Sequence, residues 1–89
     1  MRTITITIIN KLGLHARASA KFVSTAARFQ SQVEVTKDQQ TINGKSIMGV
    51  MMLAAKQGSI LTLQMNGPDE ESMEKALVNL IQQRFFEEE

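Results

Sequence analysis

The hydrophobic period changes midway through residues 2–29, which read RTITITIINKLGLHARASAKFVSTAARF. Isoleucine alternates with threonine from Arg2 to Ile9, a pattern typical of a half-buried β-strand. A loop that contains Gly13 follows. From Ala16 to Phe29 the apolar residues recur at helical spacing, and the face that they form consists of Ala16, Ala20, Phe22, Val23, Ala26, Ala27 and Phe29. These residues predict a strand followed by an amphipathic helix that packs one face on a sheet.

Three more strands are expected further along the chain. Residues 33–36 alternate valine with polar side chains, and a turn at 38–39 separates them from a short strand at 41–42. Residues 60–66 alternate again, and the face that they bury consists of Leu61, Leu63 and Met65.

Two more helices complete the pattern. Ser46 occupies the position of a helix N-cap before the apolar run Ile47 to Ala55, and Gly58 ends that unit. The last helix follows Gly67-Pro68, because proline suits a first helical turn, and its acidic start suits the helix dipole. Its buried face is expected to consist of Met73, Ala76, Leu77, Leu80, Ile81 and Phe85.

The order of these elements, βαββαβα, predicts an α+β fold. The expected architecture is an open-faced sandwich, in which a four-stranded antiparallel sheet carries three helices on one face. The chain has 89 residues, so 1–89 are expected to form one small domain. The acidic end Glu87-Glu88-Glu89 is the one low-complexity segment of the sequence.

The composition excludes several classes of function. The chain has no Cys and one His, which excludes disulfides, thiolate metal sites and multi-histidine metal sites. It has no Trp or Tyr, so a nucleic-acid partner is not expected. Its longest apolar run, residues 47–55, is far shorter than the roughly 20 residues of a membrane span. We therefore expect a cytoplasmic protein that inserts into no membrane.

Charge is unevenly distributed along the chain. Residues 1–66 contain eight basic and two acidic side chains, a net charge of +6. Residues 67–89 contain two basic and seven acidic side chains, a net charge of −5. This asymmetry is compatible with an acidic partner, although solvated surface charge alone would produce the same pattern.

The single histidine lies where a phosphoryl group could be bound. His15 stands between the glycine-containing loop and the start of the first helix, which is an N-cap or N1 position. Backbone amides there lack intrahelical acceptors, and the helix dipole favours an anion. Arg17, two residues later, could donate a guanidinium fork to the same oxygens. An isolated histidine is more often an ordinary loop residue, so this spacing alone does not establish the site.

Residues 13–22, GLHARASAKF, closely resemble the active segment of the HPr family. These are the histidine-containing phosphocarrier proteins of the bacterial phosphoenolpyruvate-dependent phosphotransferase system. The resemblance covers essentially the whole chain, because it also includes the length, the order of elements, the segment KSIMGVM at 45–51 and GPDEE at 67–71.

The resemblance implies a function and its partners. Enzyme I would phosphorylate His15 on Nδ1, and the phosphoryl group would pass to a histidine of a IIA domain. Arg17 would assist the phosphoryl group. The protein would be a monomeric carrier that needs partner enzymes and holds no cofactor or metal. In agreement with this, the sequence contains no plausible Ser-His-Asp set and no second nucleophilic histidine.

Two departures from the family pattern leave the pathway open. The family commonly has proline where this chain has Ala18. Members that serve sugar transport often carry a small polar residue where this chain has Leu12, and NKLG at 10–13 looks instead like the nitrogen-branch relative, NPr. A regulatory phosphocarrier of the nitrogen branch is therefore the alternative. A small regulatory module that acts by binding alone, without phosphorylation, is a second one.

Ser46 is a candidate for regulation. Its segment resembles that of HPr proteins in which HPr kinase/phosphorylase phosphorylates the serine from ATP. An N-cap serine without any regulatory role is equally compatible with the sequence, and the two roles can coexist, because a helix N-terminus accepts a phosphate.

The helix after Ser46 is too apolar to be fully covered by the sheet. If Val50, Leu53 and Ala54 face the sheet, the remaining apolar side chains fall on the outer arc of the helix. Exposed methionines suit a surface that binds several partners. The docking face for enzyme I and IIA domains is accordingly expected to consist of Ile47, Met48, Met51 and Met52, with the cations Lys21 and Lys45.

Overall fold

A computed structural model describes residues 1–87 of the chain. The predicted order of strands and helices is confirmed, and a short 3₁₀ turn follows the last helix. The elements are β1 (Arg2–Thr7), α1 (Ala16–Ala26), β2 (Gln32–Lys37), β3 (Gln40–Asn43), α2 (Ile47–Met52), β4 (Ile60–Asn66), α3 (Glu70–Gln82) and η1 (Arg84–Phe86).

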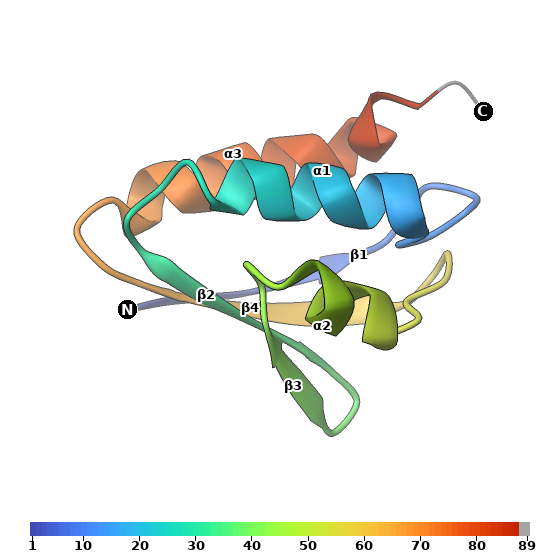
Figure 1. Ribbon diagram of the computed structural model, residues 1–89, viewed down its shortest axis with the longest axis horizontal. Helices are drawn as coiled ribbons and strands as arrows, with labels where there is room; N and C mark the ends of the chain where they lie inside the picture. The colour runs from blue at the N-terminus through green and yellow to red at the C-terminus, as the bar shows by residue number, and fades with distance from the viewer. Residues whose placement is uncertain (88–89) are drawn as a thin grey trace.

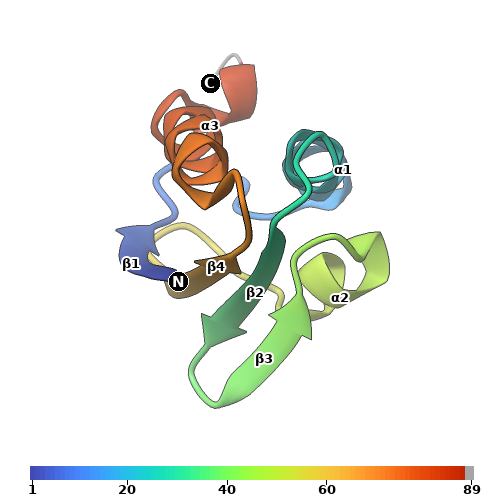
Figure 2. The ribbon, with the colours of Figure 1, turned by 90° about the vertical axis from the view of Figure 1, so that its left-hand side faces the viewer.

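The four strands form one antiparallel sheet in the order β1-β4-β2-β3. One row across the sheet shows why the register holds: Leu63 pairs with Ile4 on one side and with Val35 on the other, and Val35 pairs with Ile42. All four side chains belong to or pack against the core, so a slip of one residue would turn an apolar row toward solvent. The three helices cover the same face of the sheet, as predicted (Figure 2).

The core lies between this sheet and the helices α1 and α3, which run side by side across it (Figure 1). Phe22 of α1 and Phe85 of η1 are almost completely buried, at 1% and 0% exposure. Burial of a side chain of this size stabilises the fold by roughly 1.5–3 kcal/mol. The predicted buried face of α3 is confirmed for Met73, Leu77, Leu80 and Ile81, whereas Ala76 is half-buried.

The predicted inner face of the first helix is partly wrong. The helix ends at Ala26 rather than at Phe29, and its buried residues are Ala18, Ser19, Phe22 and Ala26. The predicted inward residues Ala16, Ala20 and Ala27 are exposed. Alanine fits either face of a helix, so counting every alanine as apolar assigned exposed residues to the predicted buried face. Serine is counted as polar, yet Ser19 is buried because its Oγ donates to the Leu14 carbonyl at 3.0 Å.

The second helix is shorter than predicted. It ends at Met52 with Leu53 as its C-cap, and Ala54 has a left-handed φ of 49° that turns the chain away. Ala54 is therefore exposed rather than directed at the sheet, and Ala55 is buried in its place. Among the elements of residues 1–87, no helix has the length and apolar character needed to cross a membrane.

Candidate functional site

Three segments that are distant in sequence meet at one end of the molecule. They are the loop between β1 and α1, the chain between α2 and β4, and the turn η1 (Figure 1). Two of them are joined by backbone hydrogen bonds: the Ile8 amide donates to the Ser59 carbonyl at 2.8 Å, and the Leu14 amide donates to the Ala55 carbonyl at 2.7 Å. The loop that carries His15 is therefore tied to the chain that follows α2.

Gly13 allows this close approach. Its φ is +65°, a left-handed conformation that costs glycine little. A Cβ at this position would lie 2.4 Å from the Ala55 carbonyl oxygen, which real contacts do not allow.

His15 is the N-cap of α1, as predicted. Its backbone is extended, with φ −72° and ψ −179°, and its carbonyl accepts from the Ser19 amide at 2.8 Å, which begins the helix. Its ring nitrogen Nδ1 accepts a hydrogen bond from the Arg17 amide at 3.2 Å. Nδ1 therefore faces the positive end of the helix dipole, where an anion is favoured.

The other ring nitrogen of His15 contacts a carboxylate. Nε2 lies 2.6 Å from Oε2 of Glu87, and the side chains of His15 and Glu87 are 26% and 10% exposed. A carboxylate only accepts hydrogen bonds and the Arg17 amide only donates, so the two contacts place the proton of a neutral ring on Nε2 and the lone pair on Nδ1.

The Glu87 carboxylate is in turn held by Asn10. Nδ2 of Asn10 donates to Oε1 of Glu87 at 3.1 Å and to the Gly13 carbonyl at 2.9 Å. Asn10 is completely buried, although its position in a polar loop gave no sign of this. Nor did the acidic end of the sequence indicate that Glu87 would contact the histidine. The one available signal was the place of Phe85 in the apolar stripe of α3, which pins the chain two residues before Glu87. Residues 88 and 89 lie outside the described residues.

Arg17 and Lys21 project from the first two turns of α1. The Arg17 side chain is exposed, and Lys21 donates from Nζ to the Phe85 carbonyl at 2.5 Å. Both line an open groove of about 430 Å³ between α1 and the end of α3, whose other lining residues are Ala20, Ser24, Thr25, Leu80 and Phe86. The predicted helper Arg17 thus lies next to His15, whereas Lys21 also anchors the C-terminal turn.

Ser46 is the N-cap of α2, as predicted. Its backbone is extended, and its Oγ accepts from the Gly49 amide at 3.1 Å. Figure 1 shows that α2 begins at the end away from the His15 loop and runs toward it. Ser46 and His15 are therefore not brought together, although they flank the same surface.

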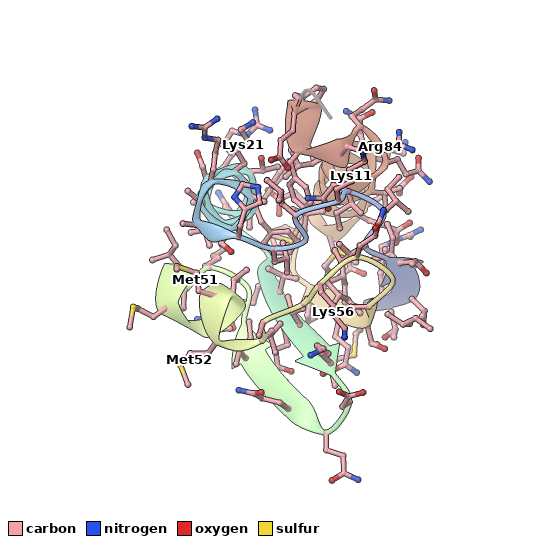
Figure 3. All side chains as sticks on the ribbon, turned by 90° about the vertical axis from the view of Figure 1, so that its right-hand side faces the viewer. Lys11, Lys21, Met51, Met52, Lys56 and Arg84 are labelled. Atoms are coloured by element: carbon pink, nitrogen blue, oxygen red, sulfur yellow. The ribbon has the colours of Figure 1, made fainter. Side chains whose placement is uncertain are left out.

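The outer arc of α2 is an apolar patch, defined here as Ile47, Met48, Met51 and Met52. Its members are 42%, 68%, 42% and 64% exposed, and Figure 3 shows Met51 and Met52 projecting away from the sheet. The predicted docking cation Lys45 is half-buried and donates to the Phe29 carbonyl at 2.7 Å. Two other exposed apolar residues, Leu12 in the loop before His15 and Phe86 in η1, were not among the predicted docking residues, and they are 69% and 63% exposed.

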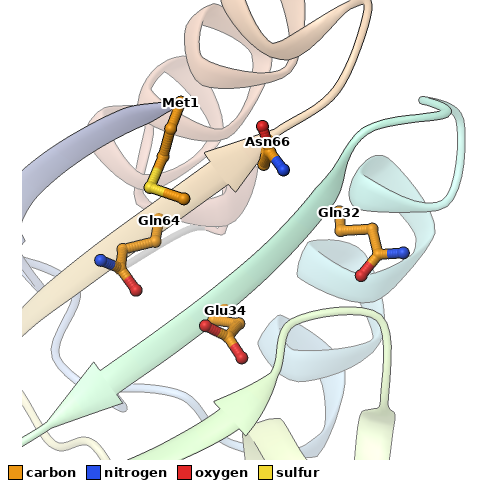
Figure 4. Close-up of a pocket in the computed structure, with 5 residues that line it drawn as sticks. All are labelled: Met1, Gln32, Glu34, Gln64 and Asn66. Carbon is orange, nitrogen blue, oxygen red and sulfur yellow. The ribbon is translucent and has the colours of Figure 1, made fainter.

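A second hollow, of about 220 Å³, lies on the opposite face of the sheet. It is lined by Met1, Gln32, Glu34, Gln64 and Asn66 (Figure 4). It contains one charged side chain and is separated from His15 by the sheet. Within residues 1–87, no group of three or more metal-ligating side chains is positioned to hold a metal ion.

Comparison with known proteins connects this geometry to a family. The family described as "PTS HPr component phosphorylation site" matches residues 2–83. The phosphocarrier protein HPr of Neisseria meningitidis serogroup A is 56% identical over 84 residues, which cover 94% of each chain.

Solved structures agree in fold over the whole chain. The crystal structure of HPr-C-His from Thermoanaerobacter tengcongensis superposes with a TM-score of 0.95 at 52% identity and covers 100% of both chains. Another structure, described as an HPr dimer from the same organism, has a TM-score of 0.79 and covers 98% of this chain and 100% of its own.

Proposed function

The chain belongs to the HPr family, the phosphocarriers of the phosphotransferase system, and from this premise we propose that His15 is the residue that carries the phosphoryl group. The observation that supports the proposal is the position of Nδ1, which accepts from the Arg17 amide at the N-terminus of α1. His15 is the single histidine of the chain, so its ring is the one imidazole that could act as the nucleophile, and its Nδ1 lies at the positive end of the α1 dipole.

The proposed reaction is a transfer between two histidines. The Arg17 amide releases the Nδ1 lone pair of His15, which then attacks the phosphorus of a phosphohistidine on enzyme I. The bond from phosphorus to the donor nitrogen breaks as the P–Nδ1 bond forms. In the second step a histidine of a IIA domain attacks the same phosphorus, and the electron pair returns to Nδ1. The first amides of α1 and the guanidinium of Arg17 are the donors proposed to bind the phosphoryl oxygens.

We infer that the protein is a carrier rather than a catalyst. It offers one nucleophile, donors for an anion and a surface for partners, while enzyme I and the IIA domain supply the rest of each active site. The apolar patch on α2, together with Lys21 and Lys45, is the proposed docking surface. The predicted monomer stays a prediction, since one solved relative is described as a dimer, and so does the cytoplasmic location.

Regulation through Ser46 is a further part of the proposal. A kinase of the HPr kinase/phosphorylase type would place a phosphate at the N-terminus of α2, next to Ile47 and Met48 of the patch. Negative charge there would oppose the approach of an acidic partner without unfolding the helix.

The branch of the phosphotransferase system depends on the partner. Leu12 is 69% exposed in the loop before His15, so a IIA domain could distinguish it from a small polar residue. This exposure keeps the nitrogen-branch alternative open, whereas the relative reported above carries the name HPr.

Phosphorylation by enzyme I tests the proposal directly. The protein is incubated with phosphoenolpyruvate and enzyme I paralogues, and acid-labile phosphate on the protein is measured. The wild type and Ser46→Ala should accept the phosphoryl group, while His15→Ala should fold normally and accept none. Arg17→Ala should accept it about tenfold more slowly, because a charge-assisted donor is lost. Arg28→Ala is the matched control, because Arg28 is an exposed arginine two residues after the end of α1. Acid-labile phosphate on His15→Ala would refute the assignment.

A further inference from the structure

We propose that Glu87, held in place by Asn10, is a positioning residue that fixes the His15 ring with its lone pair on Nδ1. The inference rests on the proposed role of His15 as the phosphoryl carrier.

Both oxygens of the Glu87 carboxylate are engaged. Oε2 lies 2.6 Å from His15 Nε2, and Oε1 accepts from Asn10 Nδ2 at 3.1 Å. The Glu87 side chain is only 10% exposed, so water competes little for these contacts. A carboxylate bound at two points cannot rotate freely, and the ring nitrogen that faces it must carry the proton.

Asn10 can face Glu87 in one orientation only. Its two N–H groups donate to the Gly13 carbonyl and to Glu87, and both of these partners are acceptors. A flipped amide would direct its oxygen at two acceptors. Its Oδ1 has no partner among residues 1–87, so the orientation is set by the two donations rather than by the oxygen. Because Asn10 is completely buried, water does not compete for these two donated hydrogen bonds.

The turn that delivers Glu87 is conformationally strained. Arg84, Phe85 and Phe86 have φ values of 54°, 56° and 56°, a left-handed path that ordinary residues avoid. Complete burial of Phe85 and the hydrogen bond from Lys21 Nζ to its carbonyl hold this path. Consecutive left-handed residues are retained only where packing overdetermines them, and such strain concentrates at functional sites.

The contact has a chemical consequence in the proposed transfer. When phosphorus bonds to Nδ1, the ring gains positive charge if Nε2 keeps its proton. Glu87 neutralises that charge and retains the proton. The protonated ring is the better leaving group, because it departs as neutral imidazole rather than as an imidazolate anion when the electron pair of the P–N bond returns to Nδ1. Glu87 should therefore keep the phosphoryl group transferable as well as keep Nδ1 accessible.

Two variants and a control test the proposal. Glu87→Gln preserves the shape of the side chain and removes its charge, and Glu87→Ala removes both contacts. Glu71→Gln is the control, because Glu71 is an exposed acid of α3 with 68% side-chain exposure. The first readout is the tautomer of the neutral His15 ring, obtained from the ¹⁵N shifts of its two nitrogens in the unphosphorylated full chain. The second is the rate at which isolated phosphohistidine hydrolyses at neutral pH.

The wild type and Glu71→Gln should show the Nε2–H tautomer, and Glu87→Ala, which removes the acceptor opposite Nε2, should show a mixture. Hydrolysis in Glu87→Gln should slow by about tenfold, the difference between a charge-assisted and a neutral hydrogen bond. An unchanged tautomer in Glu87→Ala, which would mean that the Arg17 amide alone fixes the ring, overturns the proposal, and so does an unchanged hydrolysis rate in Glu87→Gln. The tautomer measurement needs no phosphoryl donor. If enzyme I does not phosphorylate the wild type, the proposed function is refuted, and the tautomer of the His15 ring still tests the positioning role of Glu87.

Discussion

At the scale of single residues, the histidine loop depends on one position that only glycine fills. Gly13 combines a left-handed φ of +65° with a backbone contact that leaves no room for a Cβ. This close approach matters because the next residue, Leu14, donates its amide to the Ala55 carbonyl, and His15 follows directly after Leu14. A shift of this loop would move His15 relative to both Asn10 and Glu87.

We expect Gly13→Ala to destabilise the protein by about 2 kcal/mol or more, because left-handed strain adds to the overlap with Ala55. Gly58→Ala is the matched control: its φ is +91°, but nothing lies within 4 Å of its would-be Cβ, so it should cost only the strain of about 1 kcal/mol. Urea unfolding of both variants measures the difference. Equal losses of unfolding free energy in the two variants would show that the loop accommodates the added Cβ of Gly13→Ala without an energetic penalty.

The sequence predicted the role of a residue correctly where that role depends on residues adjacent to it in the chain. Ser46 was predicted as an N-cap and His15 at an N-cap or N1 position, because such a position depends on three or four adjacent residues, and both are N-caps. Glu87 and Asn10 were not found, because their contacts span 72 and 77 residues and run between side chains. No local pattern encodes such a pairing.

At the scale of elements, α2 combines a cap, a buried side and an exposed patch within six residues. Val50 at 1% exposure packs into the core, while Met48 two residues earlier is 68% exposed. The sequence predicted this division because Val50 and Leu53 share one side of a helix. It misjudged the end of the helix, because a run of apolar residues does not show where a positive φ such as that of Ala54 will occur.

Ser46→Asp should separate a regulatory site from a simple cap. Aspartate also caps helices, so the melting temperature should be retained, whereas its charge next to the patch should slow phosphorylation of His15 by enzyme I. Ser46→Ala should do the opposite: it loses about 1 kcal/mol of stability with the bond to the Gly49 amide, and it keeps the transfer rate. If Ser46→Asp accepts the phosphoryl group as fast as the wild type, Ser46 is a cap and nothing more.

Asp69, at the start of α3, gives the fold an acid-sensitive link. It accepts from the Ser31 hydroxyl at 2.5 Å and from the amides of Ser31 and Gln30 at 2.8 and 3.0 Å. These bonds, that of the Ser31 hydroxyl first, lower the pKa of Asp69 below its ordinary value of 3.8. The ionised carboxylate therefore stabilises the fold above pH 3.8, and this contribution is lost as the pH falls through the lowered pKa of the folded state.

Asp69→Asn should accordingly be less stable than the wild type at pH 7, and the gap in unfolding free energy should narrow as the pH falls below about 4. Urea unfolding between pH 7 and pH 2 measures the gap. Glu70, whose pKa is lowered chiefly by the Gly67 amide, titrates in both proteins and cancels from the difference. A gap that does not change with pH would mean that shape, and not charge, makes the link.

At the scale of the whole molecule, the fold places cations and exposed apolar side chains at the same end, the end that carries the His15 loop. Figure 3 shows Lys11, Lys21, Lys56 and Arg84 around this end, with Met51 and Met52 beside them. Lys11, Lys21 and Lys56 belong to residues 1–66, which carry the net charge of +6, whereas Arg84 belongs to the acidic segment 67–89. The fold itself was predictable because each strand and helix has its own period, and the antiparallel pairing follows from the apolar rows of β4, which lies in the interior of the sheet.

Two kinds of attraction to a partner follow from this arrangement, and salt distinguishes them. Exposed charges act over about 30 Å at 0.01 M salt and about 10 Å at 0.1 M, while apolar contact on the patch is not screened. The rate of phosphoryl transfer from enzyme I should fall as salt rises. Lys56→Gln, which removes an exposed cation at this end, should flatten that dependence and leave the rate at high salt nearly unchanged. Met51→Gln should lower the rate at every salt concentration and preserve the slope.

Lys75→Gln is the control for loss of charge, because Lys75 is an exposed lysine of α3 in the acidic segment. A rate that is independent of salt would leave the apolar patch as the sole determinant of docking, and a slope altered equally by Lys56→Gln and Lys75→Gln would mean that net charge acts without a preferred face.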